Sequence, residues 1–154
     1  MKVYGYCRIS TSKQSMERQI RNIKLAYPDA VIVKETYTGT KIQGRKEFEK
    51  LLKIVSTGDT LVFDSVSRMS RTAQEGYEMY QKLYNQGVSL VFLKEPHINT
   101  STYQQAMENQ LSVNVKTGDQ ASEELLSGIF GALNRYMLNL AKRQIQLAFE
   151  QAEK

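Results

Sequence analysis

The stretch "YGYCRISTSKQSMERQ", from Tyr4 to Gln19, indicates both how the chain begins to fold and where its chemistry lies. Its first half is a short apolar run typical of a buried strand, and its second half has the apolar spacing of a helix. The junction between the two halves carries Arg8 and the hydroxyl residues Ser10, Thr11 and Ser12. Side chains of this kind do not pack a core, so the sequence places a charged, hydroxyl-rich segment where the first strand ends.

Strand-like and helical segments alternate through the first two thirds of the chain, which is the pattern of a parallel sheet with crossover helices. We expect strands over residues 3–7, 31–34, 60–64 and 88–93. Helices are expected over residues 13–27, from about 45, over 72–86 and, more briefly, over 103–113. The predicted fold class is therefore α/β, with a mainly parallel sheet of about four to five strands and helices on both faces.

The segment from Ser122 to Lys154 contains no proline and predicts one helix of about 30 residues. We accordingly divide the chain into a catalytic α/β domain over residues 1–121 and a long helix over residues 122–154. Leucines recur every seven residues along this helix and form a heptad-like seam. The residues expected to mediate oligomerisation are Leu126, Leu133, Tyr136, Met137, Leu140 and Leu147.

A helix of this length, roughly 45 Å at the usual rise per residue, extends past a domain of this size. One interpretation is that its first half packs on the sheet of its own chain while its end frays. The seam continues through Leu140, Leu147 and Phe149, however, beyond the reach of one small sheet. We therefore expect the second half of the helix to pack against another subunit.

Composition limits the possible functions. The chain has 154 residues, which suits one compact domain, and no apolar run long enough to span a membrane. Cys7 and His97 are the only cysteine and histidine, which excludes an internal disulfide and argues against a Cys/His metal site. A cytoplasmic setting fits these features. Residues 1–71 carry 14 Lys and Arg against 7 Asp and Glu, so the excess positive charge favours a polyanionic partner such as nucleic acid.

Arginines and serines follow the first and third predicted strands, at the edge where α/β sheets bind ligands. Arg8 and Ser10 follow the first strand, and "SVSRMSR", with Arg68 and Arg71, follows the third. Arg45, at the start of the second helix, is placed to join them. Guanidinium groups bind phosphate oxygens and stabilise the charge that develops during attack on a phosphodiester. A serine hydroxyl in this setting is a candidate nucleophile.

Each of these residues also has a plainer interpretation. Ser10 and its neighbours before a helix are ordinarily N-capping groups, and Arg68 and Arg71 are ordinarily a solvated face. The group that accepts the serine proton stays open: Asp59 and Asp64 are possible, and a nearby arginine could instead lower the serine pKa. His97 lies far along the sequence in a predicted loop and is a poor candidate.

Taken together, "YGYCRISTSKQSMERQ", "GRKEFEKLL" and "GDTLVFDSVSRMSR" resemble the catalytic domain of the serine recombinases, the resolvase/invertase family. The resemblance covers about residues 1–93, with the long terminal helix following. It implies that Ser10 attacks a DNA phosphodiester and holds the 5′ phosphate covalently, until a free 3′ hydroxyl reverses the attack. The residues that it places around the scissile phosphate or near the site are Arg8, Arg45, Arg68, Arg71, Gln19 and Asp59.

The resemblance further implies a metal-independent site-specific recombinase of mobile genetic elements, which integrates, excises, inverts or transposes double-stranded DNA. It implies no cofactor, a homodimer joined through the long helix, and a tetramer in the active complex. The DNA-binding residues would be Arg8, Arg45, Arg68 and Arg71, together with Arg143 on the long helix.

The sequence departs from the family pattern at two places. Ser67 precedes Arg68 where the family often has aspartate, and Lys142 precedes Arg143 where it often has glutamate. The first departure motivates an alternative function, a catalytically inactive DNA-binding or assembly module, and a small phosphoryl-transfer enzyme is a third candidate. No recognition helix follows the long helix, so we expect the chain to be a fragment of a longer recombinase.

Overall fold

The computed structural model describes residues 1–9, 14–36, 42, 44–108 and 118–153. Its strands are β1 (Val3–Ile9), β2 (Val31–Thr36), β3 (Thr60–Phe63) and β4 (Ser89–Phe92), which form one sheet in the order β2-β1-β3-β4. All three pairings are parallel. The predicted α/β class, parallel sheet and long terminal helix are therefore confirmed.

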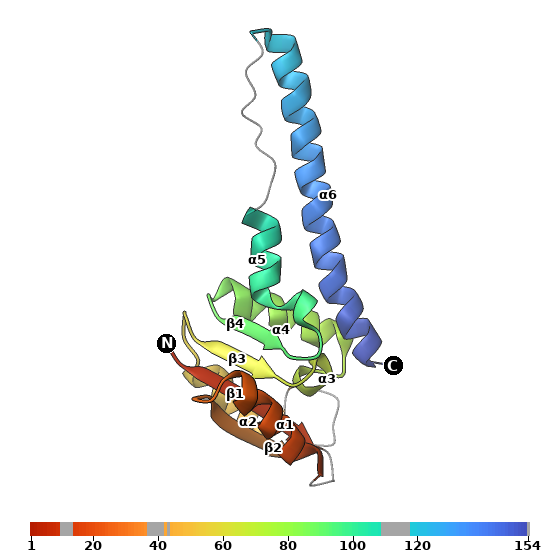
Figure 1. Ribbon diagram of the computed structural model, residues 1–154. Coiled ribbons are helices and arrows are strands. Elements are labelled where there is room, and N and C mark those ends of the chain that lie inside the picture. Colours follow the sequence, from red (N-terminus) through yellow and green to blue (C-terminus); the bar gives the residue numbers. More distant parts are fainter. Residues whose placement is uncertain (10–13, 37–41, 43, 109–117, 154) are drawn as a thin grey trace.

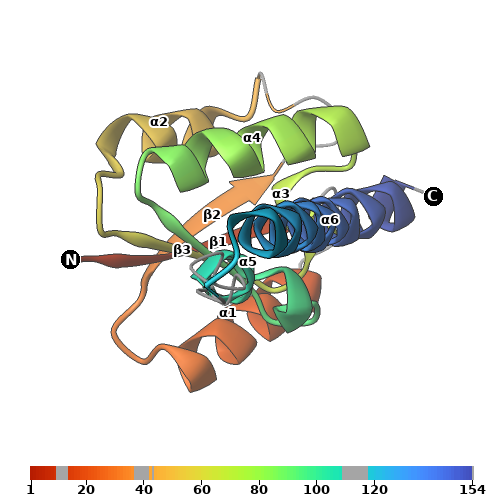
Figure 2. The same cartoon turned by 90° about the horizontal axis from the view of Figure 1, so that it is seen from above.

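Helices cover both faces of the sheet (Figure 2). α1 (Gln14–Ala26) lies on one face, and α2 (Lys46–Ile54) and α4 (Ala73–Asn85) lie on the other. The side chains of β1 alternate accordingly: Tyr4 and Tyr6 enter the larger core, and Cys7 enters the smaller core under α1. Arg8 continues the series of Tyr4 and Tyr6 because residues two apart in a strand share a face.

The register of the strands brings the site residues to one edge. Tyr6 lies opposite Phe63, the last residue of β3, and Arg8 lies opposite Glu35 of β2. β1 therefore extends past the end of β3. The chain after β3 turns at this point into α3 (Val66–Met69), a short helix that the sequence did not predict. Residues 64–71 consequently meet the carboxyl end of β1.

The free edge of β4 is closed by two polar side chains from the segment that follows it. This segment holds a short 3-10 helix (Pro96–Ile98) and then α5 (Thr100–Glu108). The backbone N–H of Phe92 donates to Asn99 Oδ1 at 2.7 Å, and that of Leu90 donates to Thr100 Oγ1 at 2.9 Å. Edge N–H groups that would otherwise recruit another strand are thereby satisfied.

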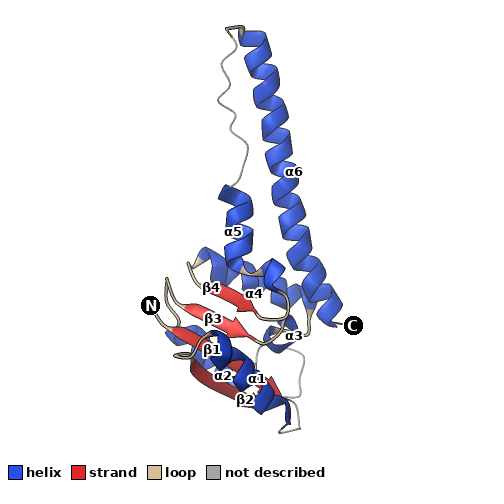
Figure 3. Ribbon diagram, viewed as in Figure 1, coloured by secondary structure: helices blue, strands red, loops and turns tan. Residues whose placement is uncertain are grey.

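The long helix, α6 (Gln120–Glu153), packs in the opposite sense to our expectation. Its C-terminal turns contact the domain, where Ile145, Ala148 and Phe149 are buried, and its N-terminal half extends away from the sheet (Figure 3). The expectation that the second half extends past the domain is therefore wrong, because it is the first half that does so. The heptad seam carried no information on which half of the helix meets its own domain.

The exposed half of α6 nevertheless carries large apolar side chains. They share one stripe along the helix, they are 43 to 66% exposed, and they comprise Leu125, Ile129, Leu133, Tyr136 and Leu140. Leu126, Met137 and Leu147, which we also expected at an interface, are half-buried. The division predicted after residue 121 falls within the first turn of α6. None of the described helices combines the length and the apolar sequence that crossing a membrane requires.

Candidate active site

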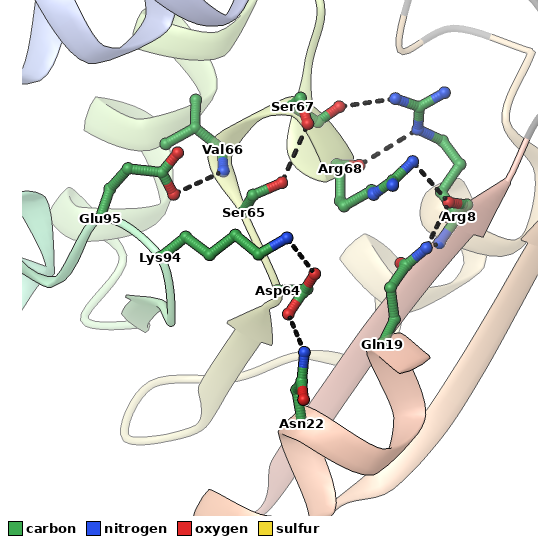
Figure 4. A network of polar contacts seen from close by, with 10 residues as sticks. All are labelled: Arg8, Gln19, Asn22, Asp64, Ser65, Val66, Ser67, Arg68, Lys94 and Glu95. Carbon is green, nitrogen blue, oxygen red and sulfur yellow. Dashed lines mark hydrogen bonds and ion pairs between the residues drawn. The ribbon is translucent and has the colours of Figure 1, made fainter. Parts of the chain in front are cut away.

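Arg8 links the end of β1 to the α3 turn. Its side chain is 1% exposed, and its guanidinium donates to two carbonyls of that turn, Ser67 O at 2.6 Å and Arg68 O at 3.3 Å. The guanidinium of Arg68 returns the contact by donating to Arg8 O at 3.2 Å. The first and third strands thus bring these two arginines together, as the sequence predicted from the edge that they share (Figure 4).

Gln19 of α1 holds the backbone of Arg8. Its Oε1 accepts the Arg8 N–H at 3.0 Å, and its Nε2 donates to the Arg8 carbonyl at 2.9 Å. The Gln19 amide therefore makes the two backbone hydrogen bonds that a neighbouring strand would make to Arg8, at a position past the end of β3. The side chain is 1% exposed, so it acts on Arg8 from within the protein.

Arg45 reaches the same turn from the start of α2. It precedes the first residue of the helix, is fully buried, and donates a hydrogen bond to Met69 O. Three successive carbonyls of α3, those of Ser67, Arg68 and Met69, are therefore bound by guanidinium groups. The turn that carries Arg68 and precedes Arg71 is positioned by the side chains of Arg8 and Arg45.

The positive charges of the four arginines act on one another. Burial, followed by the charges of Arg45, Arg71 and Arg68, lowers the pKa of Arg8 to about 10. Burial and the Arg71 charge also lower the pKa of Arg68, while Asp64 opposes the shift. Arg68 is half-buried and Arg71 is exposed. The site thus has two cations that a ligand can reach, the exposed Arg71 and the half-buried Arg68, with Arg8 and Arg45 buried behind them. Such a group of guanidinium groups suits an anion with several oxygens.

A second group of polar residues fixes the other side of the α3 turn (Figure 4). The carboxylate of Asp64 accepts from Asn22 Nδ2 at 2.9 Å and forms an ion pair with Lys94 at 3.2 Å. Glu95 accepts the Val66 N–H at 3.1 Å and so caps the start of α3. The segment after β4 therefore clamps the turn, which the sequence did not indicate.

Glu35 is another buried group that the sequence analysis missed. It accepts a hydrogen bond from Tyr6 Oη at 3.0 Å and from the backbone N–H groups of Glu47 and Phe48 at 3.1 and 3.0 Å. It therefore caps α2 and holds the helix whose start presents Arg45. Burial, followed by the Glu35 charge, raises the pKa of Tyr6. Glu35 lies one residue beyond our predicted end of the second strand, which the structure extends to Thr36, at the edge where ligands bind.

Asp59 does not lie in this cluster. It precedes β3 and accepts from the backbone N–H groups of Lys2 and Ser56, both at 3.0 Å, so it stabilises a turn at the amino end of the sheet. The arginines lie at the carboxyl end, roughly a strand length away. The structure therefore corrects its expected place near the site, which came from the family resemblance.

The other predicted residues divide into two groups. Ser10, with Thr11, Ser12 and Lys13, lies outside the described residues and follows the last residue of β1 in the sequence. Arg143 lies on α6, where it pairs with Glu150 at 3.1 Å. Its side-chain hydrogen bonds go to Gln146 and Glu150 of the same helix.

A family model described as the resolvase N-terminal domain matches residues 3–154 of the chain. The chain belongs to the resolvase family. The family that the sequence motifs predicted is thus confirmed. The resolvase chain is 32% identical over 107 residues to the transposon Tn21 resolvase of Escherichia coli, which covers 68% of this chain and 53% of that relative.

A resolvase of Clostridium perfringens is 30% identical over 98 residues, which is 63% of this chain and 51% of that protein. The chain therefore spans about half the length of these curated relatives. A crystal structure of a resolvase family site-specific recombinase from Streptococcus pneumoniae matches with a TM-score of 0.51 and 23% identity, over 100% of this chain and 99% of that one. At that identity the likeness concerns the fold.

Proposed function

We propose that this resolvase domain is the catalytic part of a site-specific recombinase, which cleaves and rejoins double-stranded DNA through a phosphoserine intermediate. The single observation that carries the proposal is the meeting of Arg8, Arg45, Arg68 and Arg71 at the carboxyl end of β1. The chain runs from this point directly into Ser10. The phosphates of a DNA backbone supply the anionic oxygens that such a cluster binds.

In the proposed reaction, Ser10 Oγ attacks the phosphorus of a DNA backbone and the bond to the 3′ oxygen breaks. The leaving 3′ oxygen takes up a proton, and the serine hydroxyl loses one. The phosphate is then joined to the protein at the 5′ end of the cut strand. A 3′ hydroxyl, from the same or an exchanged strand, reverses these steps and releases the serine. The two buried arginines would fix the turn, while Arg68 and Arg71 stabilise charge on the phosphoryl oxygens.

A covalent adduct tests this proposal. We would incubate the chain with duplex DNA at low salt, where contacts to phosphates are strongest, quench with denaturant and measure protein–DNA conjugates. We expect an adduct that maps to Ser10 and disappears in Ser10→Ala. The matched control is Ser12→Ala, which removes a neighbouring hydroxyl and should retain the adduct.

Other outcomes identify other functions. DNA binding without an adduct at any DNA concentration would contradict the proposal and favour an assembly module. Turnover of small phosphate esters without preference for duplex DNA would favour a general phosphoryl-transfer enzyme. An adduct that persists in Ser10→Ala would assign the nucleophile elsewhere.

We also propose that the chain self-associates through the apolar stripe of α6. The support is the stripe itself. Leu125, Ile129, Leu133 and Tyr136 belong to the half of the helix that extends away from the sheet (Figure 1), and Leu140 continues the stripe just past the middle of the helix. Five large apolar side chains on one exposed face carry a free-energy cost in water, which a second copy of the helix removes. A homodimer, and a tetramer on DNA, are the assemblies that we propose.

A further inference from the structure

Asp64 is a buried carboxylate that the proposed chemistry does not use directly. It follows β3, its side chain is 1% exposed, and it stands at the base of the turn that carries Arg68. Asn22 of α1 and Lys94 after β4 approach it from two other elements, at 2.9 and 3.2 Å. Three separate parts of the chain thus fix the position of one negative charge beneath the arginine cluster.

Arg68 is the arginine whose placement most requires such a charge. It lies among like charges, and its guanidinium donates a hydrogen bond to Arg8 O. Its Nε is buried and has no hydrogen-bond partner within the described residues. Asp64 Oδ2 is likewise buried and has no hydrogen-bond donor there, although it forms the ion pair with Lys94. These two buried atoms, one on a cation and one on an anion, belong to residues four apart in the chain, at the start of the α3 turn and within it (Figure 4). The Asp64 charge also raises the pKa of Arg68, against the effect of burial.

We propose that Asp64 is the positioning residue for Arg68, and that its fixed carboxylate holds the guanidinium toward the phosphate site against repulsion from the neighbouring arginines. The inference rests on the proposed function for its consequence in catalysis, but its electrostatic claim concerns this chain alone. Asp64 would act through Arg68 and would not touch DNA.

The contacts of Asp64 leave it able to serve this role. A carboxylate has about four lone-pair sites, of which the Asn22 amide and the Lys94 ammonium use two. Lys94 is 56% exposed, so water weakens its attraction, whereas Arg68 is half-buried and attracted more strongly for a given separation. Lys94 is the cation that contacts Asp64, at 3.2 Å, but its exposure lets water screen the pair, so the carboxylate keeps negative potential toward Arg68. Asn22 orients the carboxylate without neutralising it.

The direct test measures Arg68 in the chain without DNA. Hydrogen exchange of its Nε–H, followed by nuclear magnetic resonance of the arginine side chains, reports how firmly the guanidinium is held. We expect Asp64→Asn to speed this exchange by about tenfold, the effect of removing one nearby negative charge. Asp59→Asn, a matched change at the other end of β3, should leave it within about twofold.

A rescue separates a charge effect from a structural one. Ser67 is half-buried and immediately precedes Arg68 in α3, so a carboxylate there would add a negative charge to the same turn. Adding Ser67→Asp to Asp64→Asn should return Arg68 exchange to within about threefold of the wild-type rate. Unchanged exchange in Asp64→Asn, or no rescue in the double variant, would overturn the proposal.

Two further measurements complete the test. If Asp64→Asn does not fold, Lys94→Met provides a second test. Removing this cation should strengthen the attraction of Asp64 for Arg68 and slow the exchange of the Arg68 Nε–H. An unchanged or faster exchange rate would contradict the inference. In the adduct assay, Asp64→Asn should slow conjugation about tenfold while DNA affinity changes little. Absence of adduct in the wild type would count against the proposed function, while the exchange measurements would still decide the role of Asp64.

Discussion

Single side chains at the carboxyl end of β1 connect backbone geometry to the placement of charge. Arg8 binds two carbonyls of the α3 turn while its own backbone is held by Gln19. Its guanidinium is therefore both a source of positive potential and a cross-link between strands. A change that loosens its backbone should affect stability and chemistry together.

Replacing Gln19 tests this connection. Gln19→Met keeps the length of the side chain but leaves the buried N–H and C=O of Arg8 without the amide. Because an unpaired buried polar group costs about 1–3 kcal/mol, we expect a loss of that order in the free energy of unfolding, measured with urea. Gln104→Met, on the exposed face of α5, is the control and should change stability by less than about 0.5 kcal/mol. Equal losses in the two variants would contradict this account.

Cys7 gives the chain a predictable response to alkaline pH. It is fully buried, and burial, with the nearby Asp64 charge, raises its pKa to about 12 from an ordinary 9.0. Between these values the folded state keeps a proton that the unfolded state loses. The free energy of unfolding should therefore fall as pH rises above 9, by about 1 kcal/mol at pH 10.

The measurement compares urea unfolding at pH 8 and pH 10 in the wild type and in Cys7→Ala. The variant should lack this component of the pH dependence, because other titrating groups contribute equally to both proteins. An identical loss in wild type and variant would show that the thiol keeps an ordinary pKa.

The sequence predicted the arginine cluster because one rule was enough: residues after parallel strands meet at one edge. The same rule excludes Asp59, which precedes its strand, and it includes Glu35, which our predicted second strand stopped short of. Asp59 was named through family resemblance alone. The contacts of Asn22 and Lys94 with Asp64 depend on packing between distant segments, and no local pattern reports them.

At the scale of elements, the α3 turn is held by its neighbours more than by its own hydrogen bonds. It has four residues, too few for an apolar period to appear in the sequence, which is why it was not predicted. Glu95 caps its start, the arginines bind its carbonyls, and α6 packs against it. The position of the turn is therefore a property of the assembled domain.

The contact between α4 and α6 is close enough to depend on a glycine. A Cβ atom placed on Gly76 would overlap the ring of Phe149 and would lie 3.1 Å from Ser70 Cβ. We expect Gly76→Ala to lower the free energy of unfolding by about 1–3 kcal/mol through overpacking. Gly128→Ala, on α6 with open space around it, should instead stabilise the helix by about 0.5–1 kcal/mol.

A double-mutant cycle identifies the cause. Phe149→Leu makes room at the ring position, so the cost of Gly76→Ala should be smaller in that background by at least about 0.5 kcal/mol. Additive effects of the two substitutions would contradict a direct clash and would place the strain of Gly76→Ala in the backbone of α4.

At the scale of the whole molecule, α6 divides into an anchored part and an exposed part. The sequence predicted the helix and its apolar seam, because spacing alone specifies them. It did not predict which half of the helix packs on the domain, because this depends on the tertiary contacts of α6 and not on its own residue spacing. The domain contacts the C-terminal turns through α3, α4 and α5, and this leaves the apolar stripe in water.

Placing a charge on the stripe should abolish self-association. We expect Leu133→Asp to shift the chain to a monomer in sedimentation equilibrium, because a carboxylate in an apolar helix interface is strongly unfavourable. Arg135→Asp, an exposed residue of the same helix that lies off the stripe, should keep the assembly of the wild type. A wild-type chain that is monomeric at all concentrations, or a Leu133→Asp variant that still associates, would rule out the stripe as the interface.

The uneven anchoring of α6 makes it a lever. Its far end lies about 38 Å from Ile145, at 1.5 Å per residue, and its fulcrum is the set of buried turns around Phe149. A tilt of about 5° at the fulcrum moves the far end by about 3 Å. In the reverse direction, a partner that pulls the free end transmits torque to the short helix on which the arginines converge.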